Sequence, residues 1–311
     1  MSTIEHANLH THDQTHHHHT HAASSHHVHG HHLLQVSHLS VSFSMYDSEA
    51  PYFSAQRVES KAIDDLSISV HEGEVVAVVG ASGSGKTLLA DAIMGLYEPN
   101  ARVKGEVWFD GAQMSAADLA AVRGRSGGIA LVPQGVAHLD PLMRVGKQVI
   151  GPCDRVEQAD RTAKCAALFK RYGLEESVMQ LYPYQLSGGM ARRVLLCTAL
   201  MGDPRLIIAD EPTPGLDLDL AVAALADFPT FADQGGGVML ITHDIELALR
   251  VADRVAVFKE GTVVEETAVA NFASPDLLSH PFSRALWHAL PDHDFACADE
   301  EPFDSNGEAH A

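Results

Sequence analysis

The sequence is short of the features that mark nucleic-acid-binding and membrane-spanning proteins. It has 21 Lys and Arg residues against 41 Asp and Glu, and the formal net charge of −20 repels phosphate backbones and anionic membrane surfaces. We therefore expect no nucleic-acid partner. No stretch reaches the roughly 18 apolar residues that a helix needs to cross a bilayer, and the N-terminus has no apolar signal core. Any membrane contact is thus expected through a partner protein.

Cysteines are also scarce. The chain has four, Cys153, Cys165, Cys197 and Cys297, and none of them forms a Cys-x-x-Cys spacing. This pattern predicts neither a disulfide framework nor a zinc site, and it fits a reducing cytosol.

Large apolar side chains are nearly absent from both ends of the chain. Residues 1–32 hold 13 of the 21 histidines, and the last 20 residues carry seven acidic groups and no Lys or Arg. Such segments bury too little apolar surface to offset the entropy of ordering. We predict a disordered His-rich tail over residues 1–32 and a flexible acidic tail over residues 291–311.

The sequence between these tails predicts one main globular unit of the α/β class, over residues 33–290. The fully apolar "EVVAVVG" is typical of a strand buried in a parallel sheet. Later strands, "LIIAD", "VMLIT" and "RVAVF", alternate with helical stretches, which is the rhythm of a doubly wound sheet. Two β-patterned runs precede them, and residues 144–202 are mostly helical in pattern.

The segment "GASGSGKT" matches the phosphate-binding motif G-x-x-x-x-G-K-[ST], and it lies between a predicted buried strand and a predicted helix. Glycines let backbone N–H groups turn inward around phosphates, and the helix N-terminus adds partial positive charge. A lysine supplies a full charge, and a threonine hydroxyl can bind Mg²⁺. The predicted phosphate-binding residues are Gly80, Ser82, Gly83, Ser84, Gly85, Lys86 and Thr87.

The segment "LIIADE" places two carboxylates at the carboxyl end of a predicted strand. Open α/β sheets present their ligand-binding groups at that edge. Asp210 is suited to holding Mg²⁺ with ATP, and Glu211 to acting as the general base on an attacking water.

The segment "YQLSGGMARRV" resembles the signature of the ATP-binding subunits of ABC transporters, with Leu186, Ser187, Gly188 and Gly189 in the signature positions. Ser187 can cap the following helix, and two glycines permit close backbone approach, so this is a second anion-binding helix N-terminus. A second phosphate-binding element implies a second ATP-facing surface.

Other residues agree with the same resemblance. Phe43 falls where the family stacks an aromatic ring on adenine, with Tyr46 as an alternative. Gln134 matches the glutamine that senses Mg²⁺, although Gly135 departs from the acidic or amide residue that usually follows. His243 matches the histidine that contacts the γ-phosphate. Asp217 fits the loop that crosses the dimer, although "PTPGLD" departs from the commoner Ser and Ala there.

The resemblance implies a P-loop NTPase (RecA-like) core with an N-terminal antiparallel β subdomain and an inserted helical subdomain at about residues 135–200. It implies ATP and Mg²⁺ as ligands and a head-to-tail pair of ATPase subunits, either identical or paralogous. It also implies two integral membrane permease subunits and, indirectly, an extracytoplasmic substrate-binding protein. The chain would then be peripheral on the cytoplasmic face of the inner (plasma) membrane.

The segment "SHPFSRALWHALP" resembles the C-terminal motif of the peptide and nickel importer branch. The expected function is therefore an ATPase that powers import of nickel, a metal chelate or small peptides. The alternatives are a dipeptide or oligopeptide importer with no metal role, and a soluble ABC-type ATPase acting on nucleic acid. The last needs a coiled-coil or zinc insertion, or a second nucleotide core, and none is evident.

The histidine tract bears on the cargo. Neutral imidazoles suit Ni²⁺, Cu²⁺ and Zn²⁺ better than Mg²⁺, and a flexible chain can bring several to one ion. The candidate Ni²⁺ or Zn²⁺ ligands are His16, His17, His18, His19 and His21. A pH-responsive tail and incidental low complexity remain open alternatives.

Overall fold

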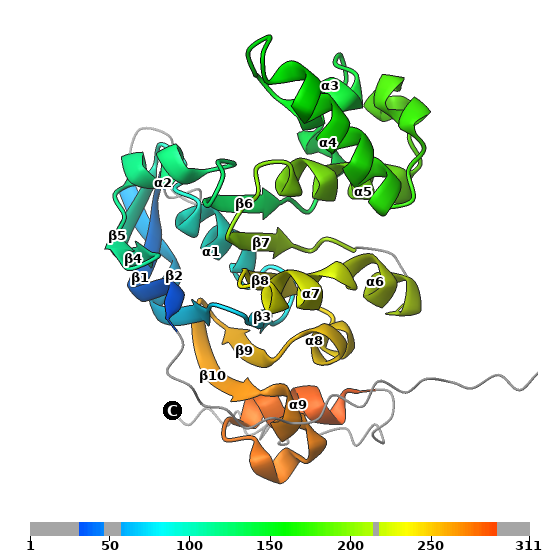
Figure 1. Cartoon of the computed structure of the whole chain (residues 1–311). Helices are drawn as coiled ribbons and strands as arrows, with labels where there is room; N and C mark the ends of the chain where they lie inside the picture. Colours follow the sequence, from blue (N-terminus) through cyan, green and yellow to red (C-terminus); the bar gives the residue numbers. More distant parts are fainter. Residues whose placement is uncertain (1–30, 47–56, 214–217, 291–311) are drawn as a thin grey trace, which may run out of the picture. The chain divides into compact units, whose positions relative to one another are not determined.

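The computed structural model of the chain describes residues 31–46, 57–213 and 218–290. Within this part lie an antiparallel sheet, a mostly parallel sheet covered by helices, and a separate group of helices (Figure 1). No helix in the described ranges is long and apolar enough to span a bilayer.

The antiparallel sheet has the strand order β2-β1-β4-β5. Its strands are β1 (His32–Tyr46), β2 (Arg57–His71), β4 (Ala101–Phe109) and β5 (Ala112–Gln113). Buried apolar residues such as Leu34 of β1 and Val70 of β2 are paired across the strands, so one face packs into a core. β1 already begins at His32, inside the range assigned to the tail, because His32 pairs with His71.

The second sheet has the strand order β10-β9-β3-β8-β7-β6. Its strands are β3 (Val75–Val79), β6 (Ile129–Val132), β7 (Leu206–Asp210), β8 (Gly237–Thr242), β9 (Arg254–Lys259) and β10 (Thr262–Ala268). All of them are parallel except β10, which pairs antiparallel with β9. Every residue of β3, β7 and β8 is buried, as expected of strands covered on both faces. The predicted α/β architecture is confirmed.

Helices cover both faces of this sheet (Figure 1). On one face α1 (Lys86–Ile93) shares a core with the antiparallel sheet and with α2 (Ala116–Val122). On the other face α6 (Leu218–Leu225), α7 (Asp227–Asp233) and α8 (Ile245–Val251) pack on β7 and β8. The sheet thus holds its strand ends, and the loops that follow them, in fixed positions.

The helical group consists of α3 (Val145–Ile150), α4 (Gln158–Arg171) and α5 (Gly188–Leu200), with 3₁₀ turns at Val136–His138, Glu176–Gln180 and Pro183–Gln185. It has a hydrophobic core of its own, in which Val149, Phe169 and Val194 are buried. A separate core is what an inserted subdomain needs in order to fold as a unit.

After β10 the chain forms two 3₁₀ turns, Val269–Ala273 and Pro275–Leu277, and then α9 (Pro281–His288). The indole N–H of Trp287 donates to the carbonyl of Phe272 at 2.8 Å. The Glu265 carboxylate accepts the backbone N–H groups of Ser279 and His280. The amphipathic helix of the "SHPFSRALWHALP" motif is therefore docked on the edge of the parallel sheet.

Candidate nucleotide site

The loop from Gly80 to Thr87 joins the end of β3 to the start of α1, as its motif predicts. Gly80 has no room for a side chain, because a Cβ there would lie 2.2 Å from the carbonyl oxygen of Phe258. Gly85 has a φ of 107°, in the left-handed region that favours glycine. These two glycines let the loop pass close to β9 and turn directly into the helix.

Lys86 is the first residue of α1, and its side chain reaches back to the start of this loop. Its side chain is buried, and Nζ donates to the carbonyl oxygens of Gly80 and Ala81, both at 2.8 Å. Burial lowers the pKa of the ammonium group, while the nearby carboxylates of Glu211 and Asp210 raise it. The structure therefore places Lys86 close enough to both predicted carboxylates, Asp210 and Glu211, for their charges to interact.

Two buried oxygen atoms at the loop have no hydrogen-bond partner among the described residues: Ser84 Oγ and Asp210 Oδ1. Burial raises the pKa of Asp210, against a hydrogen bond from the Thr87 side chain that lowers it. A buried polar atom without a partner carries a desolvation penalty of about 1–3 kcal/mol. A phosphate group and a magnesium ion would supply the missing partners, so these residues fit both ligands.

Glu211 and His243 follow the neighbouring strands β7 and β8. The His243 Nδ1–H donates to both carboxylate oxygens of Glu211, at 2.8 Å each. Glu211 has a φ of 46°, rare for a residue other than glycine, and its N–H donates to the carbonyl of Ile241 in β8. Such a backbone conformation is held by surrounding structure and is frequent at functional sites.

A cleft of about 610 Å³ lies beside this loop. Loop residues Ala81 to Gly85 line it, together with Ala62, Leu88 and Phe282. Two basic residues that the motifs do not include, Lys61 and Lys259, also line it. Topology could have indicated Lys259, because β9 is parallel to β3 and ends at the same edge of the sheet.

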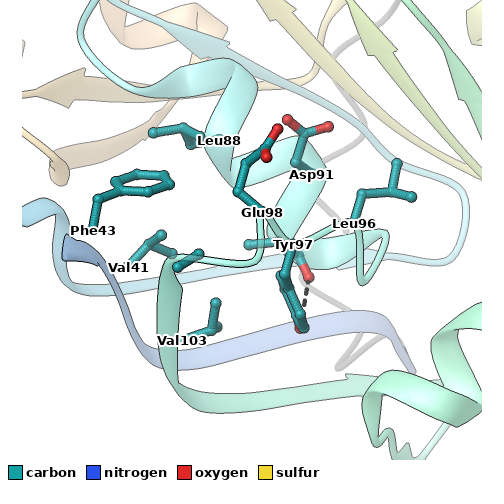
Figure 2. A pocket seen from close by; sticks show the side chains of 10 residues that line it. Val41, Phe43, Leu88, Asp91, Leu96, Tyr97, Glu98 and Val103 are labelled. Atoms are coloured by element: carbon teal, nitrogen blue, oxygen red, sulfur yellow. Dashed lines mark hydrogen bonds between the residues drawn. The ribbon is translucent and has the colours of Figure 1, made fainter. Parts of the chain in front are cut away.

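Phe43 lies in β1 beside α1 and lines a second cavity of about 300 Å³. Figure 2 shows its ring at one side of this cavity, facing Leu88, with the carboxylates of Asp91 and Glu98 beyond. Leu88 lines both this cavity and the cleft of the phosphate loop. Tyr46, the alternative aromatic residue, ends β1, and its side chain lies outside the described part.

The signature residues Leu186 to Gly189 lie at the start of α5, in the helical group. Ser187 is the N-cap, and its hydroxyl oxygen accepts the N–H of Met190 at 3.2 Å. Ser187 and Gly188 are exposed, and a Cβ added to Gly188 or Gly189 would meet no atom within 4 Å. Nothing within the described chain therefore requires glycine at these two positions.

Gln134 lies in the loop between β6 and the 3₁₀ turn at Val136–His138, where it is exposed. Its neighbour Gly135 has an ordinary extended conformation, and a Cβ there would make only ordinary contacts. The unusual glycine is thus not required by the backbone. Asp217 and the candidate metal ligands His16, His17, His18, His19 and His21 lie outside the described residues.

Comparisons with known proteins agree with this geometry. The sequence profile of the ABC transporter family matches residues 63–214. The oligopeptide transport ATP-binding protein OppD of Lactococcus lactis subsp. cremoris is 36% identical over 242 residues, covering 74% of this chain and 70% of that protein. The dipeptide transport ATP-binding protein DppD of Haemophilus influenzae is 35% identical over 270 residues, covering 84% and 78%.

The fold has solved counterparts as well. A dimeric ATP-binding cassette in a post-hydrolysis state, bound to ADP and Pi, has a TM-score of 0.61 to this chain at 27% identity, covering 76% of this chain and 98% of that one. The chain therefore belongs to the ABC transporter family, as an ATPase with the P-loop NTPase fold that its sequence predicts.

Proposed function

We propose that the chain powers an ABC importer of small peptides by hydrolysing ATP. The observation that best supports ATP turnover is the electrostatic interaction of Lys86 with Asp210 and Glu211, together with two buried oxygens, Ser84 Oγ and Asp210 Oδ1, that have no partner among the described residues. The relatives OppD and DppD, named for oligopeptide and dipeptide transport, favour peptides as the cargo.

In this proposal the loop from Gly80 to Thr87 binds the β- and γ-phosphates. The backbone N–H groups of Ser82 to Gly85 surround the phosphates, and Lys86 exchanges its two carbonyl partners for phosphate oxygens. The base of ATP stacks on Phe43. Leu88 lines both the cavity beside Phe43 and the cleft of the phosphate loop.

Thr87, Asp210 and Gln134 are the residues that would hold Mg²⁺. Bound there, the ion would neutralise charge that develops on the phosphates. The unpartnered Oδ1 of Asp210 supports this assignment.

Glu211 acts as the general base in this scheme. It accepts a proton from the attacking water, and His243, already bonded to its carboxylate, keeps that carboxylate in place and reaches the γ-phosphate. Gln134 orients the same water from the loop that leads into the helical group.

The second half of the site comes from a second ATPase subunit. Leu186, Ser187, Gly188 and Gly189 offer an exposed, capped helix N-terminus to the nucleotide of the partner, and Asp217 contacts the partner across the dimer. Closure of the pair would exclude water from the reacting phosphate, and hydrolysis would reopen it. The partner is a second copy of this chain or a paralogue.

The motion is passed to two integral membrane permeases, which place the chain at the cytoplasmic face of the inner membrane. An extracytoplasmic substrate-binding protein delivers the cargo. Detergent extraction followed by affinity purification of the full chain tests this: two co-purifying integral membrane proteins support the importer. Salt-sensitive binding of DNA or RNA without such partners would support a soluble ATPase instead.

Nickel or a metal chelate is the second candidate cargo, favoured by the histidine tract alone. Its test is uptake of radiolabelled nickel and of a labelled dipeptide in cells that carry the wild-type chain or a variant with His16, His17, His18, His19 and His21 replaced by Asn. Loss of nickel uptake only would support nickel as cargo, with Ni²⁺ or Zn²⁺ bound by the tail. Unchanged uptake of both would leave the tract without a role in transport.

A further inference from the structure

Two histidines face each other at one end of the antiparallel sheet. His32, the first residue of β1, pairs in register with His71, the last residue of β2, and their ring centroids are 4.5 Å apart. Residues directly opposite in an antiparallel pair project to the same face, with Cβ atoms about 4.5–5.5 Å apart. The register therefore places two imidazole rings side by side on one face of the sheet.

The carboxylate of Glu74 sets the orientation of His71. Its Oε2 accepts the His71 Nδ1–H at 2.8 Å and the backbone N–H of the same residue at 2.9 Å. Arg254 holds Glu74 in turn, through Nε to Oε1 at 2.8 Å.

In the tautomer that donates Nδ1–H to Glu74, the lone pair of His71 lies on Nε2, and Nε2 has no hydrogen-bond partner among the described residues. Metal-binding histidines commonly have this arrangement, with a carboxylate that fixes the tautomer and the ring orientation. The ring of His32 also has no hydrogen bond within residues 31–46, 57–213 and 218–290.

We propose that His32 and His71 form a two-imidazole site for a divalent late transition metal, Ni²⁺, Cu²⁺ or Zn²⁺. Neutral imidazole selects these ions over Mg²⁺ and Ca²⁺. Across the described part of the chain no group of three or more His, Cys, Asp or Glu side chains is placed to hold a metal, so water completes the coordination. An ion at this site joins the start of β1 to the end of β2 and stabilises that end of the sheet.

Thermal unfolding of the full-length chain, with and without NiSO₄, tests this site separately from the His-rich tail. A ligand raises Tm only if it binds the folded state better than the unfolded state, and the cross-strand pair exists only in the folded state. At ten times the Kd the expected rise is about 2–4 °C. His71→Asn and His32→Asn should each abolish the rise, measured from the metal-free Tm of each variant.

Two control variants should keep the rise. His38→Asn removes an exposed histidine of β1 that bonds to Asp65 at 2.7 Å. Replacement of His16, His17, His18, His19 and His21 by Asn removes tail ligands. Glu74→Gln, which keeps both imidazoles, should raise the nickel concentration at half effect about 10–100-fold. No rise at any nickel concentration that leaves the protein soluble, or a rise that survives both His32→Asn and His71→Asn, would overturn the proposal.

Discussion

His243 and Glu211 are in direct contact, with Nδ1 of the imidazole 2.8 Å from both oxygens of the carboxylate. The two residues are far apart in the sequence but follow strands that pair directly in parallel, β7 and β8. The contact joins the proposed general base to the residue proposed to reach the γ-phosphate. The catalytic role of Glu211 is therefore expected to depend on His243, and the role of His243 on Glu211.

Glu211→Gln should bind ATP and form dimers but hydrolyse ATP about 10²–10⁴-fold more slowly, because an amide cannot accept the proton of the attacking water. Nucleotide affinity and steady-state turnover measure the two effects separately. Glu246→Gln is a matched control, since this α8 residue pairs with Arg250 on the same helix. Normal turnover of Glu211→Gln would remove Glu211 from the role of general base.

Asp210→Asn should stabilise the nucleotide-free chain while abolishing its response to Mg²⁺. Burial raises the pKa of Asp210 above its ordinary value of 3.8. The folded state then binds more protons than the unfolded state, so the contribution of Asp210 to stability is present below pH 3.8 and is lost as the pH rises through the raised folded pKa. Asparagine has no such dependence.

Urea unfolding at several pH values, with and without Mg²⁺ and ATP, checks this prediction. The stability gained in Asp210→Asn should be larger at pH 7 than near pH 4, and the added stabilisation by Mg²⁺ over ATP alone should disappear. Asp276→Asn, at an exposed position near the C-terminus, serves as the control. A full Mg²⁺ response in Asp210→Asn would show that this carboxylate does not hold the ion.

The buried thiols should resist alkylation in the folded chain. Cys165 and Cys197 are fully buried, and burial raises the pKa of Cys165 to about 11 and that of Cys197 to about 12. Since the thiolate is the reactive form, a pulse of iodoacetamide at pH 8 should modify the partly exposed Cys153 before Cys165 and Cys197. Peptide mass spectrometry measures each site. Equal labelling of Cys165 and Cys153 in the folded chain would contradict the assigned core of the helical group.

The same raised pKa values predict how stability depends on alkaline pH. Both thiols titrate near their ordinary value of 9 once unfolded, so above pH 9 the unfolded state binds fewer protons than the folded state. The free energy of unfolding should therefore fall as the pH rises from 9 towards the folded pKa values. Cys197→Ala would reduce this slope.

Local patterns predicted the elements that carry the site, but not the contacts between them. The apolar run of β3 and the glycine motif after it predicted the phosphate loop, because both signals lie within one short segment. The approach of Phe258 to Gly80 and the bond of Arg254 to Glu74 join distant residues, so they depend on strand order. The pairing of His32 with His71 likewise depends on register, and composition alone placed His32 in the tail.

Gly188→Ala and Gly189→Ala distinguish an interface role from a folding role. A Cβ at either position would meet no atom within 4 Å, and alanine favours a helix over glycine by about 0.5–1 kcal/mol, so stability should hold or rise slightly. If these glycines face the nucleotide of a partner, ATPase activity should nevertheless fall. Gly80→Ala should lower both stability and ATPase activity, because its Cβ would overlap the carbonyl of Phe258.

Thermal unfolding and ATPase assays over a range of protein concentrations complete the glycine test. In the wild-type chain, or with its paralogue added, turnover per molecule should rise with concentration, since each site is completed by a second subunit. In Gly189→Ala the rise should be reduced while single-chain binding of ATP, measured below the concentration for pairing, stays unchanged. Constant turnover per molecule in a monomeric preparation would show that one chain contains the whole site and that its signature serves another purpose.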